Sequence, residues 1–87
     1  MARILAIHKQ AFNDIVYFTR HDLKLVKKIF ELIEDIQKTP FDGIGKPEPL
    51  KYVLKGVWSR RITDEHRLVY QITDNEIVIF SCRYHYS

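Results

Sequence analysis

The sequence predicts a small α+β domain in which a hairpin of two helices covers one face of an antiparallel sheet. Three observations support this fold class. A chain of 87 residues is long enough for one modest core and too short for two. Apolar residues recur at helical spacing in the first half of the chain and alternate at strand spacing in the second half. The expected order is β-α-α-β-β-β, in a single domain that spans residues 1–87.

The N-terminal half contains the first strand and both helices. Residues 3–7 form a short apolar run that we interpret as a strand, because a signal peptide needs a longer apolar region and a small-residue cleavage site. His21-Asp22 separates the two helices, and Asp22 is suited to cap the second one. The first helix is predicted by Ala11, Phe12, Ile15 and Phe18, which share one face. The second is predicted by the apolar stripe Val26, Ile29, Phe30, Ile33 and Ile36.

The C-terminal half contains a loop and three strands. Thr39-Pro40 ends the second helix, and the next nine residues hold two glycines and two prolines, a composition typical of a loop. These glycines lack the spacing of a nucleotide-binding loop. Strands are expected at 57–63, 66–73 and 76–84, with the last buried on both faces. Short turns between them predict an antiparallel meander.

Composition excludes several classes of protein. With 46% hydrophobic and 29% charged residues, the chain is too apolar to be disordered. It has no apolar run near the roughly 20 residues that a membrane helix needs. One cysteine, Cys82, cannot form an internal disulfide, which fits a cytoplasmic location. Basic residues outnumber acids between positions 46 and 61, which predicts either a phosphate-facing surface or an ordinary solvated face. They are Lys46, Lys51, Lys55, Arg60 and Arg61, against Glu48 alone.

Metal and nucleophile chemistry are poorly supported, so no cofactor is expected. The histidines and the cysteine lack the spacing of a zinc site, and no acidic cluster suggests magnesium. Ser59, Ser81 and Cys82 lie inside predicted strands, without the sharp turn that exposes a nucleophile.

The remaining possibility is catalysis by a general acid and a general base. Glu48 is held between Pro47 and Pro49, which stiffen the backbone around a carboxylate. Arg67 lies within a strand, where it needs either a phosphate or a salt bridge to Asp64 or Glu65. His85 belongs to a bulky C-terminal tail and could donate a proton if that tail is docked. Each residue alone also fits a structural or solvated role. Together they form a base, an anion-stabilising cation and an acid, which suffice for metal-free RNA cleavage through the 2′-hydroxyl.

Three segments resemble the Txe/YoeB group of the RelE/ParE superfamily of toxins. They are Thr39–Lys51, with its Gly-Ile-Gly-Lys-Pro-Glu-Pro core, Trp58–Tyr70, and the C-terminal Cys82-Arg83-Tyr84-His85-Tyr86. The motifs occur in the right order, and with residues 26–29 in register the match covers nearly the whole chain. The resemblance implies a RelE-like fold and the toxin of a type II toxin–antitoxin module.

The resemblance further implies a ribosome-dependent endoribonuclease that cleaves mRNA in the A site. By motif position, Glu48 is the expected general base, His85 the general acid and Arg67 the group that stabilises the phosphorane. Tyr86 is expected to orient the reacting groups. The expected RNA contacts are Lys46, Lys51 and Arg61. The implied partners are a YefM-like or Axe-like antitoxin, the ribosome with its mRNA and, as in some relatives, a second copy of the toxin; no membrane is expected.

Two other classes compete with this interpretation. A ParE-like toxin would bind gyrase without cleaving RNA, but such a binder needs no base and acid. An RNA-binding module without activity would use exposed aromatic side chains to stack on bases. Trp58 and Tyr70 alternate away from the face that carries Arg67, which favours the core for both rings.

Overall fold

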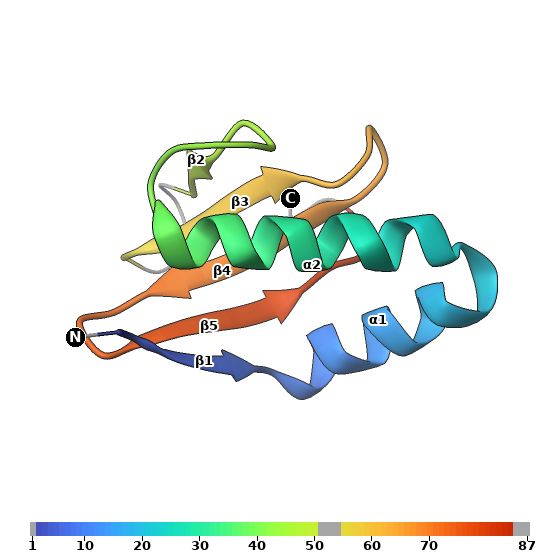
Figure 1. Cartoon of the computed structure of the whole chain (residues 1–87), viewed down its shortest axis with the longest axis horizontal. Helices are drawn as coiled ribbons and strands as arrows, with labels where there is room; N and C mark the ends of the chain where they lie inside the picture. The colour runs from blue at the N-terminus through green and yellow to red at the C-terminus, as the bar shows by residue number, and fades with distance from the viewer. Residues whose placement is uncertain (1, 51–54, 85–87) are drawn as a thin grey trace.

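The computed structural model describes residues 2–50 and 55–84 of the chain (Figure 1). The order of elements in this part confirms the helical hairpin and the three-strand meander, and it adds one short strand. The elements are β1 (Ile4–Ile7), α1 (Lys9–His21), α2 (Leu23–Lys38), β2 (Glu48–Pro49), β3 (Val57–Arg61), β4 (Arg67–Ile72) and β5 (Glu76–Ser81). Asp22 lies between the helices as expected, although its side chain makes no capping hydrogen bond.

The strands form one mixed sheet in the order β1-β5-β4-β3-β2. The meander β3-β4-β5 is antiparallel, as predicted. The predicted antiparallel sheet includes one parallel pair, because β1 runs parallel to β5, with Ile4 opposite Glu76. A parallel neighbour requires a crossover, and the two helices supply it.

Strand β2 falls within the segment expected to be a loop. It pairs antiparallel with β3, so that Glu48 lies opposite Ser59 and Pro49 opposite Trp58. The Leu50 N–H donates to the Val57 carbonyl at 2.8 Å and extends this pairing. Proline is compatible with such a position because β2 is an edge strand, which needs fewer N–H donors than a central one.

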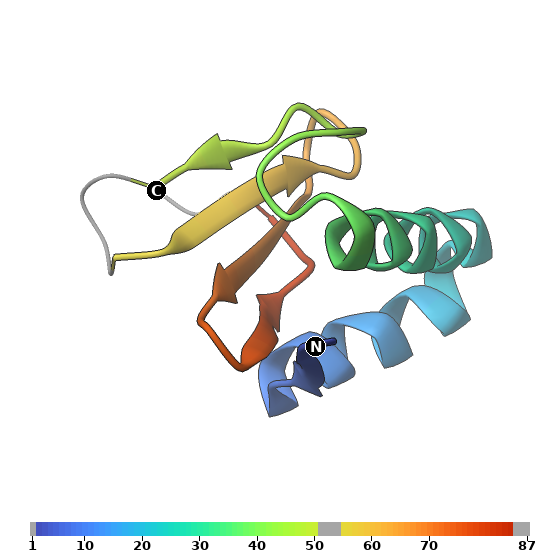
Figure 2. The same ribbon diagram turned by 60° about the vertical axis from the view of Figure 1, so that its left-hand side comes forward.

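Both helices pack on one face of the sheet, and the core lies between the two layers (Figure 2). The helices contribute Ala11, Phe18, Ile29, Leu32 and Ile36, and the sheet contributes Leu68, Tyr70, Ile77 and Ile79. Two aromatic residues from the predicted apolar faces of the helices are about half exposed: Phe12 at 51% and Phe30 at 47%. Each follows a fully buried residue, Ala11 or Ile29, and the turn of about 100° per residue carries its side chain toward solvent.

Strand β5 differs from the predicted strand over 76–84 in both length and burial. It ends at Ser81 and not at Tyr84, and it is not buried on both faces. Ile77 and Ile79 are buried toward the helices, whereas Val78 and Phe80 are only partly buried. The pattern is that of a strand with one helix-covered face, which an apolar run alone does not distinguish from a fully buried strand.

Candidate active site

A buried arginine on the helix-facing side of the sheet holds the loop that leads to Glu48. The side chain of Arg60 is fully buried, and its guanidinium donates five hydrogen bonds. Their acceptors are the Tyr70 hydroxyl, an Asp35 carboxylate oxygen at 2.6 Å, and the backbone carbonyls of Thr39, Asp42 and Ile44. A guanidinium has five N–H groups, so every donor is used. One side chain therefore fixes the end of α2, the loop and the sheet relative to one another.

The prediction that Arg60 belongs to a basic surface was wrong. The sequence counted it among the cations of a phosphate-facing segment, but no part of it faces solvent. Its position could have been found from alternation, because Arg60 lies between Trp58 and Ile62 on the face that packs against the helices. Its hydrogen bond to Asp35 holds the pKa of that carboxyl below its usual value. Burial raises the pKa of the Tyr70 phenol.

The loop also passes close to the helix layer. Gly45 has φ of +80°, and a Cβ there would lie 2.8 Å from a Leu32 methyl carbon. Its carbonyl accepts a hydrogen bond from the Arg61 N–H at 2.6 Å. Lys46 follows with φ of +51° and is exposed at the start of the turn into β2. This geometry places Lys46 and Glu48 on the outer edge of the sheet.

Glu48 and two arginines share the face of the sheet opposite the helices. Paired residues on neighbouring strands project to the same face, and Glu48 is paired with Ser59, two residues before Arg61 on β3. Arg61 is in turn paired with Arg67 on β4. From strand spacing and rise, the Glu48 and Arg67 Cα atoms lie about 12 Å apart. That separation leaves room for a nucleotide between the ends of the two side chains.

The Arg61–Arg67 pair is unusual for a sheet, because like charges directly opposite each other are destabilising. Both guanidiniums have a buried Nε without a hydrogen-bond acceptor in the described part of the chain. Arg61 approaches Asp64 at 3.7 Å, and Glu65 approaches His66 at 3.2 Å. Arg67, however, forms no ion pair with any residue among 2–50 and 55–84, so the salt bridge considered from the sequence is not found there. The pair concentrates positive charge where an anion could bind.

The chain after β5 returns to Arg67. The Arg67 N–H donates to the Tyr84 carbonyl at 3.1 Å, so the C-terminal segment begins beside this arginine. Lys51, His85 and Tyr86, which the sequence predicted to be part of the site, lie outside the described residues. Their roles and those of Glu48, Arg61 and Arg67 remain predictions.

No group of three or more His, Cys, Asp or Glu side chains within 2–50 and 55–84 could hold a metal ion. In the same part of the chain, neither helix is long and apolar enough to cross a membrane.

Comparison with known proteins identifies the family. Residues 7–86 match the family model described as "YoeB-like toxin of bacterial type II toxin-antitoxin system". The chain belongs to this family of toxins. The YoeB toxin of Escherichia coli K12 is 56% identical over 78 residues, which cover 90% of this chain and 93% of that protein. The YoeB toxin of Synechocystis is 54% identical over 82 residues, covering 94% and 95%.

Solved structures of the family agree with the fold. A YoeB dimer from Staphylococcus aureus is 50% identical, with a TM-score of 0.89, and the match covers 99% of this chain and 100% of that one. The toxin of a heterotetrameric YoeB–YefM complex from the same organism is also 50% identical, with a TM-score of 0.84 and the same coverage. The fold is therefore that of the YoeB toxins.

Proposed function

We propose that this toxin is a metal-independent endoribonuclease that cleaves mRNA in the ribosomal A site. The observation that carries the proposal is the Arg61–Arg67 pair, two cations opposite each other on a sheet face that also carries Glu48. A phosphodiester between them would relieve their repulsion and accept hydrogen bonds from both guanidiniums. Arg67 is the better placed for the reacting phosphate, because no acid neutralises it within residues 2–50 and 55–84.

In the proposed reaction, Glu48 removes the proton of the 2′-hydroxyl, and the 2′-oxygen attacks the adjacent phosphorus. A bond between the 2′-oxygen and phosphorus forms as the bond to the 5′-oxygen breaks. Arg67 stabilises the additional negative charge of the phosphorane. His85 gives its proton to the departing 5′-oxygen, and Tyr86 orients the groups. The products are a 2′,3′-cyclic phosphate and a 5′-hydroxyl, so no water, metal or redox partner is consumed.

The remaining cations are assigned to binding. Lys46 is exposed beside Glu48, and Arg61 adjoins Arg67. Together with Lys51 they would neutralise phosphates on either side of the cleaved bond, which adds affinity without sequence preference. We also propose a YefM-like or Axe-like antitoxin as partner, a homodimer as one state of the free toxin, and the cytoplasm as the place where both meet the ribosome. The YoeB–YefM complex and the YoeB dimer of the relatives support the two protein partners.

Translating ribosomes provide the test. The purified toxin should cut mRNA within the A-site codon and leave 2′,3′-cyclic phosphate ends, which end mapping detects. Cleavage should persist in EDTA when enough free magnesium is left to keep the ribosomes intact. Intact mRNA together with trapped gyrase–DNA complexes would support a gyrase-binding toxin instead. Activity lost to EDTA and restored by zinc would contradict the metal-free mechanism.

A further inference from the structure

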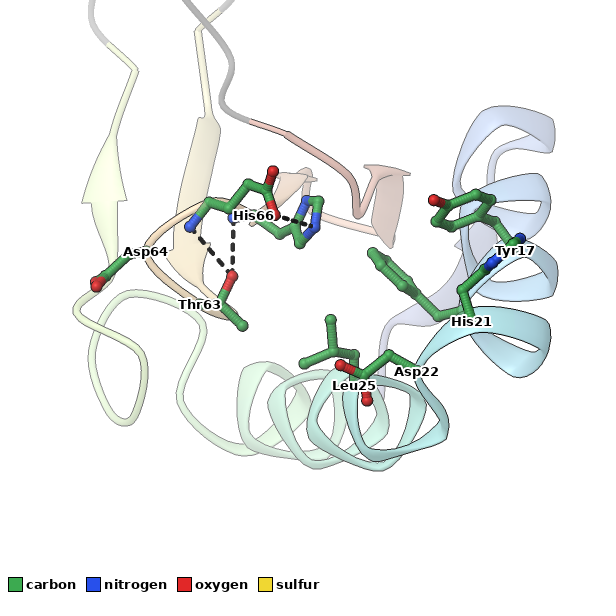
Figure 3. Close-up of a pocket in the computed structure, with 9 residues that line it drawn as sticks. Tyr17, His21, Asp22, Leu25, Thr63, Asp64 and His66 are labelled. Carbon is green, nitrogen blue, oxygen red and sulfur yellow. Dashed lines mark hydrogen bonds and ion pairs between the residues drawn. The ribbon is translucent and has the colours of Figure 1, made fainter.

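His66 occupies a buried position between the turn after β3 and the C-terminal segment. It is 7% exposed, and its ring lies between the rings of Phe18, with centroids 5.0 Å apart, and Tyr84, at 5.4 Å. Figure 3 shows the imidazole beside a cleft formed by the turn and the corner between the two helices. None of the proposed catalytic steps uses this residue.

The hydrogen bonds of His66 fix which nitrogen carries the proton. Nδ1 lies 2.8 Å from the Tyr84 backbone nitrogen and accepts its N–H. The proton of the neutral ring is therefore on Nε2, which lies 3.2 Å from a Glu65 carboxylate oxygen. The Thr63 hydroxyl accepts the backbone N–H groups of Glu65 and His66 and holds the turn beneath the ring (Figure 3). The ring is therefore built to offer an acceptor to the C-terminal segment.

Tyr84 needs such support because its backbone is in the left-handed region, with φ of +64°. This conformation is unfavourable for a non-glycine residue and persists where surrounding contacts impose it. Two backbone hydrogen bonds do so, from the Tyr84 N–H to His66 and from the Arg67 N–H to the Tyr84 carbonyl. The Arg83 guanidinium adds a contact at 3.5 Å from the ring centroid of Tyr17 and donates to the Tyr84 hydroxyl at 3.0 Å.

We propose that His66 is a positioning residue that fixes the backbone of Tyr84, the residue that immediately precedes the proposed general acid His85 in the sequence. The inference rests on the proposed function, in which His85 is the general acid. Tyr84 is bonded directly to His85, so the backbone that His66 holds is the one to which the proposed acid is attached. An error of about 1 Å in a reacting group can cost about 10²-fold in rate. His66 itself touches neither the phosphate nor a reacting atom.

Two amide variants separate the acceptor from the rest of the side chain. The Oδ1 of His66→Asn can take the place of Nδ1 and still accept the Tyr84 N–H. The longer His66→Gln places its amide near the former Nε2 and removes that acceptor. Glu65→Gln is the matched control, because it removes the carboxylate charge near Nε2 and leaves the Nδ1 acceptor unchanged.

The first test is independent of RNA cleavage. In the wild-type protein, nitrogen NMR should show a His66 ring protonated at Nε2 and not at Nδ1, and the Tyr84 amide should exchange slowly with solvent. His66→Gln should speed this exchange about tenfold, the size expected for one lost hydrogen bond, and should leave the Leu68 and Ile79 amides unchanged. His66→Asn and Glu65→Gln should keep the protection. A proton on Nδ1 in the wild type, or unchanged Tyr84 exchange in His66→Gln, would overturn the proposal.

The second test asks whether His66 acts through His85. In single-turnover cleavage on ribosomes, His66→Gln should be at least about tenfold slow with the ordinary substrate. A substrate with sulfur in place of the 5′-oxygen needs no acid and should restore both His66→Gln and His85→Ala, but not Glu48→Ala. Equal slowing of His66→Gln on both substrates would mean a merely structural role and overturn the proposal. If His85→Ala cleaves at the wild-type rate, His85 is not the general acid and that part of the proposed function is wrong. The amide-exchange measurement still decides whether His66 holds Tyr84.

Discussion

Replacing Arg60 should expose how much of the fold depends on one buried guanidinium. Arg60→Met keeps an apolar stem of similar length and removes all five N–H donors. Removing one partner of a buried ion pair typically costs about 3–5 kcal/mol, because the other charge is left behind. Here the Asp35 side chain is 27% exposed and water can solvate it, so the loss should lie near the lower end, about 3 kcal/mol.

Urea denaturation followed by tryptophan fluorescence measures this loss. For a domain of this size, a slope of about 1 kcal/mol per molar urea makes the expected shift in midpoint about 3 M. Arg60→Lys should fall between the wild type and Arg60→Met, because an ammonium has only three donors. Arg20→Met, at an exposed position of α1, is the matched control and should change stability by less than about 0.5 kcal/mol. A loss that small for Arg60→Met would mean that the five hydrogen bonds of Arg60 contribute nothing net to stability.

Three further results follow from the structure. Arg60 lowers the pKa of Asp35 in the folded protein below the unfolded value of about 3.9. The ionised Asp35 therefore stabilises the folded protein above about pH 5, and this stabilisation is lost as the pH falls through the folded-state pKa. The stability difference between the wild type and Asp35→Asn in urea titrations should therefore shrink below about pH 4, and a pH-independent difference would contradict this. Arg67→Ala should slow single-turnover cleavage by at least about 10²-fold, with partial recovery in Arg67→Lys; full activity would make Arg67 a structural residue. Burial raises the pKa of the Cys82 thiol to about 12, so Ellman's reagent at pH 8 should label it in urea and not in the folded protein.

The sequence predicted the local elements better than their long-range pairing. Apolar periodicity located both helices, alternation located the strands β3 and β4, and a continuous apolar run located β5. The parallel partner of β1 could not be predicted in this way, because Ile4 and Glu76 are brought together by the packing of the helices between them. Strand β2 has only two residues, too few for any alternating pattern.

Alternation along the strands also predicts part of the site. Alternation places Arg67 on the face opposite Tyr70, and the register with β3 brings Arg61 beside it. The role of Arg60 could not be predicted from residue types, because three of its five acceptors are backbone carbonyls of the loop. The hydrogen bond between His66 and Tyr84 depends equally on a backbone group and on a left-handed conformation that sequence patterns do not signal.

The pH dependence of single-turnover cleavage on ribosomes, measured where chemistry limits the rate, tests whether Glu48 and His85 carry out the reaction. If Glu48 must be ionised and His85 protonated, the profile should be bell-shaped. Glu48→Ala should flatten the acid limb and His85→Ala the alkaline limb, each at a cost of roughly 10²- to 10⁴-fold. The double variant should lose less than the product of the two, since the groups act together. A wild-type rate and an unchanged profile in both single variants would mean that the ribosome supplies the chemistry and that this toxin is not the catalyst.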